Sequence, residues 1–284
     1  MMPPFVEGVF LKKFMTGDSY LNPAAAPGMF TRVFPSLSFY SRLLLGPFRW
    51  VCRRAARGQC DDAAWIYAST WVSDIMESMG CTVHVEGMGV LAAMDGPCIF
   101  VANHMSTLET FMLPGIIRPH RLLTFVAKRS LVTMPMFGAV MRSRDPIVVD
   151  RANPREDFTI VMKEGVERLQ RGISIIVFPQ STRTLQFDPR HFNSIGVKLA
   201  KRANVPIVPL ALKTDAWGQG KKFKELGKIS PSLPIRYRFG QAMHIHGQGR
   251  EEHEAVCAFI ADALQEWRTR NEDISRKKEK GPCV

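Results

Sequence analysis

His104 and Glu109 are two residues whose types and spacing could perform general base catalysis. They stand five residues apart, so on one continuous helix their side chains would point in different directions. If His104 stays in a loop before the helix, the carboxylate of Glu109 can meet the imidazole and fix its tautomer. In the other interpretation Glu109 only caps its helix, and His104 is an ordinary polar loop residue. The stretch alone leaves both interpretations open.

The residues around this pair predict a strand, a turn and the start of a helix. Residues 98–102 form a short apolar run behind a glycine and a proline, which is typical of a buried strand. Ser106 and Glu109 have the spacing of a capping box and predict a helix that begins there. His104 therefore falls between a strand end and a helix N-terminus, where open α/β sheets bind their ligands.

Basic residues stand just beyond three further strand-like runs, namely Lys128 after 122–127, Arg151 after 146–149 and Arg183 after 173–178. Beside one histidine, cations at several strand ends would form a pocket for an anion, and a phosphate suits the forked guanidinium of arginine. A single basic residue at a strand end is usually only solvated. Three of them in one sheet favour a binding site.

Strand-like and helix-like runs alternate through the larger part of the chain. The predicted strands are 82–86, 98–102, 122–127, 146–149, 173–178, 205–212 and 234–239. The predicted helices between and after them are 106–117, 154–171, 191–203 and 250–270. This alternation predicts an α/β fold with a mostly parallel or mixed sheet flanked by helices.

The N-terminal part predicts an amphipathic helical extension. Residues 30–57 are apolar and aromatic at helical spacing, carry several arginines and contain Pro47, which would kink a helix. Their apolar side belongs either to the core or to a bilayer interface with anionic head groups. A second helix over 62–79 is expected to face the core. The expected organisation is a membrane-associating segment 1–80, an α/β domain 81–270 and a disordered basic tail 271–284.

Composition narrows the possible partners. The chain has 284 residues, of which 46% are hydrophobic, and its net charge of +12 favours nucleic acid, a phospholipid surface or a phosphorylated substrate. No uninterrupted apolar run of about 18 residues occurs, which argues against a spanning helix. The first residues lack the pattern of a secretory signal. The six cysteines contain no Cys-x-x-Cys pair, which favours reduced thiols over a metal site.

Four blocks of residues resemble the glycerolipid acyltransferase family typified by bacterial 1-acyl-glycerol-3-phosphate acyltransferase. That family has Asn-His-x4-Asp, then Lys-x-x-Leu with Pro-x-x-Gly and Asp-Arg, then Phe-Pro-Glu-Gly-Thr-Arg-Ser, then Val-Pro-Ile-Val-Pro. The corresponding residues here are 103–109, 128–151, 178–184 and 205–209. The order and spacing of the four blocks hold across about residues 83–212.

The resemblance implies acyl transfer from acyl-CoA or acyl carrier protein to the hydroxyl of a lysophospholipid, foremost 1-acyl-glycerol-3-phosphate. His104 would be the general base and Glu109 its partner. The implied substrate-binding residues are Lys128, Arg151, Gln180, Ser181, Thr182 and Arg183. Since a thioester is already activated, neither a metal nor a cofactor is expected. The implied location is peripheral, on the cytoplasmic face of a membrane, with the phospholipid surface as partner.

Several residues depart from the family pattern, among them Asn193, which stands where the family often has Lys. Glu109 replaces Asp and is longer by one C–C bond, roughly 1.5 Å, while Gln180 replaces Glu and Ser181 replaces Gly. These changes leave open another lysolipid acceptor, such as a lyso-ornithine lipid, or a lipid-binding protein without activity. A nucleic-acid-binding protein would also explain the positive charge. Against it, the sequence has no helix-turn-helix, RNP or paired Cys/His signature.

Overall fold

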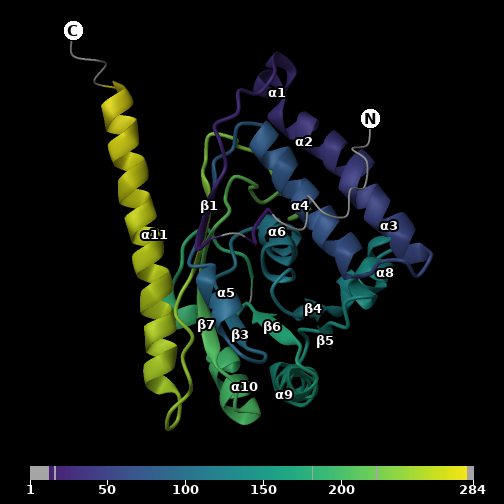
Figure 1. Ribbon diagram of the computed structural model, residues 1–284, viewed down its shortest axis with the longest axis vertical. Coiled ribbons are helices and arrows are strands. Elements are labelled where there is room, and N and C mark those ends of the chain that lie inside the picture. Colours follow the sequence, from purple (N-terminus) through teal and green to yellow (C-terminus); the bar gives the residue numbers. More distant parts are fainter. Residues whose placement is uncertain (1–12, 16, 181, 222, 280–284) are drawn as a thin grey trace.

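The computed structural model describes residues 13–279 except 16, 181 and 222, and it has the predicted α/β architecture (Figure 1). Within this part of the chain, one eight-stranded sheet has the order β1-β2-β8-β7-β3-β6-β4-β5. Pairing is antiparallel at β1–β2 and β7–β8 and parallel at the other neighbours. The mostly parallel, mixed sheet is thus confirmed.

The strands are β1 (Ser19–Leu21), β2 (Val83–Glu86), β3 (Ile99–Ala102), β4 (Leu123–Lys128), β5 (Ile147–Val149), β6 (Ser174–Val177), β7 (Ile207–Lys213) and β8 (Ile235–Phe239). Every strand predicted between residues 82 and 239 is present, with its ends shifted by at most two residues. β1 was not predicted. It pairs with β2 and so joins the N-terminal segment to the sheet of the α/β domain.

The central strand β3 explains why its apolar run was readable from the sequence. All four of its residues are buried. Phe100 and Ala102 belong to the core on one face of the sheet, and Ile99 and Val101 to the core on the other. A parallel strand that is covered on both faces has no polar side, so it appears as a continuous apolar run.

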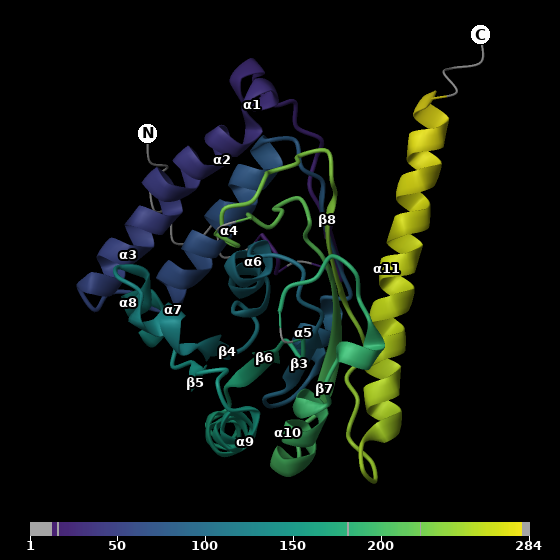
Figure 2. The same ribbon diagram turned by 180° about the vertical axis from the view of Figure 1, so that it is seen from behind.

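Helices cover both faces of the sheet (Figures 1 and 2). The helices that follow β2 are α5 (Gly89–Ala93), α6 (Leu108–Ile117), α7 (Arg129–Thr133), α8 (Phe137–Arg142), α9 (Pro154–Gln170), the 3₁₀ turn η3 (Pro189–His191), α10 (Ile195–Ala203) and α11 (Arg250–Glu279). The helix predicted over 191–203 begins at Ile195, because η3 occupies the preceding turn. α11 continues beyond residue 270 to Glu279, and residues 280–284 of the expected tail lie outside the described part.

The amphipathic segment 30–57 is divided into α1 (Met29–Val33), α2 (Pro35–Leu43), the π-helical turn η2 (Leu44–Phe48) and α3 (Arg49–Ala56). The chain bends in front of Pro47, where Gly46 leaves the helical region with φ −97° and ψ −114°. A proline ring clashes with the preceding turn of a helix and lacks the N–H that continues it. The predicted kink is confirmed.

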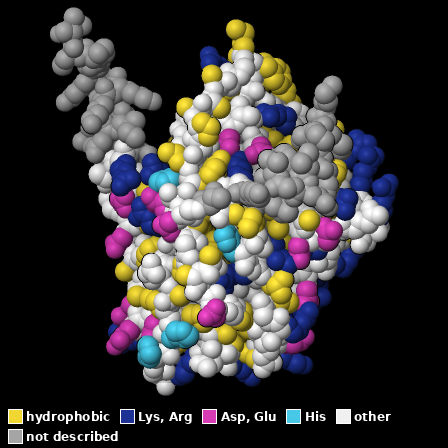
Figure 3. All heavy atoms as spheres, in the orientation of Figure 1, with side chains coloured by type: hydrophobic (Ala, Val, Ile, Leu, Met, Phe, Trp, Pro, Cys, Tyr) yellow, Lys and Arg dark blue, Asp and Glu magenta, His cyan; other side chains and the backbone are white. Residues whose placement is uncertain are grey.

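The apolar side chains of this segment are divided between the core and the surface. Phe39 and Leu43 of α2 are buried in the core, where they pack with α4 (Asp62–Ser78), the expected core helix. A group on α1 and early α2 is exposed, and we call it the α1–α2 surface: Met29, Phe30, Val33, Phe34 and Leu37. Figure 3 shows hydrophobic side chains gathered at that end of the molecule. In the described part of the chain, no helix combines the length and apolar character that crossing a bilayer requires.

Candidate active site

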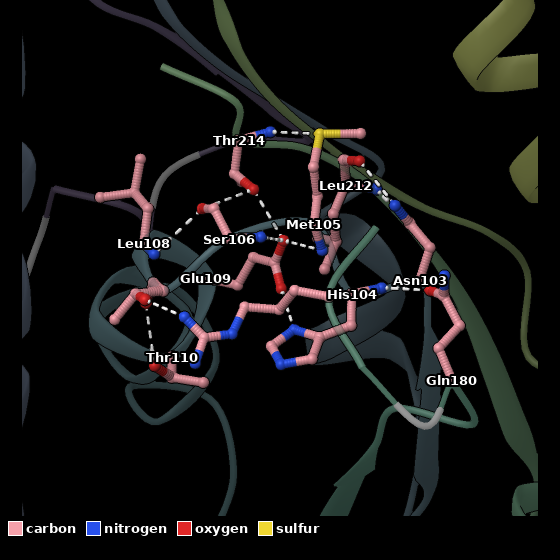
Figure 4. Close-up of polar contacts among 12 residues, drawn as sticks. Asn103, His104, Met105, Ser106, Leu108, Glu109, Thr110, Gln180, Leu212 and Thr214 are labelled. Atoms are coloured by element: carbon pink, nitrogen blue, oxygen red, sulfur yellow. Dashed lines mark hydrogen bonds and ion pairs between the residues drawn. The ribbon is translucent and has the colours of Figure 1, made fainter. Parts of the chain in front are cut away.

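The candidate active site lies at the carboxyl ends of β3 and β6, which are parallel neighbours. Asn103 directly follows β3, and its side-chain amide donates to the carbonyl of Leu212 at 2.9 Å. The amide oxygen of Asn103 accepts from the Leu212 N–H at 2.8 Å (Figure 4). These two bonds extend the contact between β3 and β7 by one residue. They fix the point at which the chain leaves the sheet towards His104.

His104 and Glu109 meet as the first interpretation requires. The imidazole Nδ1 lies 2.6 Å from Glu109 Oε2, while the second ring nitrogen points away from the carboxylate (Figure 4). The side chain of His104 is 13% exposed and that of Glu109 is fully buried. The ring of Phe178 stacks on the imidazole with 4.4 Å between centroids. Because a carboxylate only accepts, Nδ1 carries the proton in the neutral ring and Nε2 keeps its lone pair.

Glu109 also caps its helix, so the two interpretations are not exclusive. Its Oε1 accepts the N–H groups of Met105 at 2.7 Å and Ser106 at 2.8 Å. Ser106 Oγ accepts from the Leu108 N–H at 3.1 Å, so the capping box is formed from the glutamate side only. One carboxylate oxygen holds the loop and the other holds the histidine.

Thr214, which directly follows β7, is a supporting residue that the sequence reasoning missed. Its hydroxyl donates to Glu109 Oε1 at 2.7 Å and accepts from Ser106 Oγ at 2.9 Å. A buried charge is costly unless hydrogen bonds replace its water, and Thr214 supplies one of them. The sequence contained one signal for this role: Thr214 stands just beyond a strand that is predicted to lie in the same sheet as 98–102.

We expect Thr214→Val to lower kcat by about tenfold or more, because one hydrogen bond to a charged group is worth about 1.5–3 kcal/mol. Thr214→Ser keeps the hydroxyl and should restore most of kcat. Steady-state kinetics of both variants measure the effect, with thermal unfolding as the control for folding. Wild-type kcat in a folded Thr214→Val protein would remove Thr214 from the support of Glu109.

The segment after β6 forms hydrogen bonds with both the backbone N–H and the backbone carbonyl of His104. Gln180 Oε1 accepts from the His104 N–H at 2.5 Å, and the Thr184 N–H donates to the His104 carbonyl at 2.9 Å. The Gln180 amide nitrogen also donates to Thr184 Oγ1 at 2.6 Å. Gln180 is therefore buried support for His104, a contact that the sequence did not reveal. Its predicted role in substrate binding stays a prediction.

Arg183 is the predicted cation that lies beside the His104 loop. Its guanidinium donates to Thr107 Oγ1 and, at 2.8 Å, to Glu225 Oε1. Partial burial raises the pKa of Glu225, but Arg183, a backbone hydrogen bond and the charge of Lys224 together leave this pKa below its ordinary value. Thr182 is exposed, and its hydroxyl lies 3.4 Å from Lys224 Nζ. Ser181 lies outside the described residues.

Lys128 and Arg151 share the sheet edge with His104 but lie farther along it. Lys128 ends β4 and Arg151 follows β5, so one and two strands, respectively, separate their strands from β3. With neighbouring strands about 4.8 Å apart, their strands lie roughly 10 and 14 Å from β3. Both side chains are exposed. The structure thus brings Arg183 to Thr107 in the loop that follows His104, and it leaves the other two cations at a distance that a large substrate could span.

This arrangement can remove a proton and hold an anion. His104 Nε2 is the atom available for proton transfer, and Arg183 presents a guanidinium at Thr107, three residues after His104. Among the described residues, no group of three or more His, Cys, Asp or Glu side chains is arranged to hold a metal ion.

Comparisons with known proteins find similarity to acyltransferases. Residues 82–213 match the Acyltransferase family. The chain is 28% identical to 1-acyl-sn-glycerol-3-phosphate acyltransferase of Pseudomonas aeruginosa over 82% of this chain and 85% of that protein. It is 32% identical to the enzyme of the same name from Saccharomyces cerevisiae, over 53% of this chain and 49% of that one.

A solved structure has the same fold. The crystal structure of the 1-acyl-sn-glycerophosphate (LPA) acyltransferase PlsC from Thermotoga maritima superimposes with a TM-score of 0.63. It is 18% identical, and the match covers 83% of this chain and 95% of that one. The fold, the histidine–glutamate pair and the family match define an acyltransferase. More narrowly, the match over residues 82–213 and the similarity to the named relatives support the glycerolipid acyltransferase family.

Proposed function

We propose that the protein transfers a fatty acyl group from acyl-CoA or acyl carrier protein to the hydroxyl of a lysophospholipid, foremost 1-acyl-glycerol-3-phosphate. The observation that carries this proposal is the 2.6 Å contact of His104 with Glu109 next to the guanidinium of Arg183. A base and an anion-binding group side by side suit an acceptor that carries both a hydroxyl and a phosphate. The name of the Pseudomonas aeruginosa relative supports the same substrate class.

In the proposed mechanism, His104 Nε2 takes the proton of the acceptor hydroxyl while the oxygen attacks the thioester carbonyl carbon. The negative Glu109 stabilises the imidazolium that forms, and the stacked ring of Phe178 limits its rotation. The tetrahedral intermediate then breaks its C–S bond. The thiolate leaves with the proton of the imidazolium, which returns His104 to its starting state.

Acceptor binding is assigned to the cations at the sheet edge. Arg183 would grip the phosphate through a forked pair of N–H groups, as guanidinium groups do with oxyanions. Lys128 and Arg151 would add positive charge farther along the edge. Thr182 would contact the acceptor next to Arg183, and the assignment of Ser181 to acceptor binding rests on the sequence alone.

An acceptor panel tests the proposal. Purified protein is incubated with labelled acyl-CoA and, separately, with 1-acyl-glycerol-3-phosphate, a lysolipid whose phosphate is esterified and a lyso-ornithine lipid. We expect the phosphate monoester to give the fastest product formation. If only the lyso-ornithine lipid gives a product, that lipid is the acceptor in place of 1-acyl-glycerol-3-phosphate. If no acceptor gives a product, the proposed function is contradicted.

We infer further that the protein binds peripherally to the cytoplasmic face of a membrane through the α1–α2 surface. Phe30 and Phe34 are 57% and 53% exposed there, and their rings lie 5.7 Å apart. Arg32 lies between them in α1. An exposed apolar group that carries a cation suits the boundary between acyl chains and anionic head groups.

We expect the combined change Phe30→Ser and Phe34→Ser to weaken binding to anionic vesicles by at least about tenfold, since each ring loses burial in lipid. Phe158→Ser, which changes an exposed phenylalanine of α9, is the matched control. Vesicle sedimentation at low and high salt measures binding. Deleting residues 1–57 is a poorer test, because it removes the buried Phe39 and Leu43. Full pelleting of the double variant would place the contact elsewhere.

A further inference from the structure

Residues 219–228, which we call the 219–228 loop, connect two segments that are fixed to each other and to α2. At its base, Trp217 and Ile229 form an antiparallel bridge, and the Gly218 N–H donates to the Lys228 carbonyl at 2.9 Å. The hydroxyl of Tyr40 in α2 donates to the Gly227 carbonyl at 2.6 Å. The base is therefore rigid and lies against the helix that carries part of the α1–α2 surface.

The tip of this loop has the composition of a lipid-contacting element. Phe223 and Leu226 are 67% and 56% exposed. The basic residues around them are also exposed: Lys221, Lys224 and Lys228. Large apolar side chains among lysines suit an anionic lipid surface, in which the apolar groups leave water and the ammonium groups meet phosphates. The Tyr40 contact places the base of the loop against α2, the helix that carries Leu37 of the α1–α2 surface.

Between these two apolar side chains stands Glu225, whose carboxylate lies 2.8 Å from the guanidinium of Arg183. Trp217 Nε1 donates to the backbone carbonyl of Glu225 at 3.0 Å, and Lys224 reaches the hydroxyl of Thr182. The loop thus covers the group assigned to the acceptor phosphate. An oxyanion of this chain occupies the position that the oxyanion of a substrate would need.

We propose that the 219–228 loop is a second lipid-contacting element, and that Glu225 blocks Arg183 until the loop tip enters an anionic phospholipid surface. Insertion of Phe223 and Leu226 moves Glu225 with them, because all three lie within one short turn of the loop. The guanidinium of Arg183 is then free to bind a phosphate. A phosphate carries more charge than a carboxylate, so it competes well with Glu225 for the same N–H groups. This inference rests on the proposed function for the role of Arg183, but not for the lipid contact.

The lipid contact is tested without substrates. We expect the combined change Phe223→Ser and Leu226→Ser to weaken binding to phosphatidylglycerol-containing vesicles by about tenfold, while Phe158→Ser leaves it unchanged. Sedimentation measures binding, and circular dichroism checks the fold. Unchanged binding of the folded double variant would overturn the lipid contact. Because no turnover is involved, failure of the proposed acyl transfer cannot be mistaken for this result.

The block on Arg183 is tested by kinetics in the absence of vesicles, with a short-chain acceptor below its micelle concentration. Glu225→Gln should lower the KM for this acceptor by about two- to fivefold, because the free energy of a partly exposed ion pair corresponds to a change of that size. It should also reduce the stimulation by anionic vesicles. Glu251→Gln, which changes an exposed glutamate at the start of α11, is the control. An acceptor KM and vesicle stimulation equal to wild type in Glu225→Gln would overturn the block.

Discussion

His104→Ala is expected to lower acyl transfer by at least about a hundredfold while the fold stays intact, because a positioned general base contributes about 10²–10⁴-fold. The imidazole is the only side-chain base in contact with Glu109 among the described hydrogen bonds of that carboxylate. Without it, the acceptor hydroxyl must lose its proton to water. Initial rates with saturating acyl-CoA measure the loss. An alanine variant that keeps more than about a tenth of the wild-type rate would contradict the assignment.

Variants of Glu109 separate orientation from charge in the same experiment. Glu109→Asp keeps the charge and should be the milder change, although its shorter side chain must reach both the loop and the histidine. Glu109→Gln should be the more damaging one. Its amide nitrogen must face either the imidazole Nδ1–H or the N–H groups that Oε1 now accepts, so a donor meets a donor. Equal rates of Glu109→Gln and wild type would reduce Glu109 to a helix cap.

Arg183→Ala is expected to lower kcat/KM for a phosphate-bearing acceptor by roughly a hundredfold, the loss of two charge-assisted hydrogen bonds worth about 1.5 kcal/mol each. The KM for acyl-CoA should change little. Arg183→Lys should recover only part of the activity, because an ammonium group cannot grip a phosphate with a fork. Lys128→Ala and Arg151→Ala should have smaller effects, in keeping with their greater distance from β3.

Steady-state kinetics with varied acceptor measure these losses, and Arg190→Ala is the control for removing one positive charge. Arg190 is exposed and pairs with Asp188 two residues away in its own turn. An Arg183→Ala variant with unchanged acceptor kinetics would show that the phosphate is bound elsewhere. The Glu225 carboxylate left behind by this change is half-exposed, so water can solvate it.

The sequence allowed the sheet and the histidine–glutamate pair to be predicted for a definite physical reason. Strands such as β3 are buried on both faces, and their apolar runs are local signals that need no knowledge of neighbours. Glu109 is close in sequence to both of its possible partners, His104 and the start of its own helix, so both contacts could be predicted. The two interpretations are compatible, because a carboxylate has two oxygens and can serve both.

The supporting residues could not be predicted, because their partners are distant in sequence. Thr214 reaches Glu109 across 105 residues, and Gln180 reaches His104 across 76. A threonine or glutamine gives no periodic signal for such a contact. The pairing of Glu225 with Arg183 was hidden for the same reason, since it depends on the path of an irregular loop. Likewise, amphipathic spacing in 30–57 revealed an apolar side but not its division between core and surface.

The position of β8 has a consequence for how the chain is made on a ribosome. β8 is the neighbour of β2, and their salt-bridged residues Glu86 and Arg238 are 152 residues apart. At about 5–20 residues per second, the pair β1–β2 waits roughly 8–30 s for the strand that connects it to β7. During this interval the apolar side of α2, including Phe39, has no completed sheet to cover it. A nascent chain stopped before Phe239 would therefore expose two unjoined parts of one sheet to chaperones and proteases.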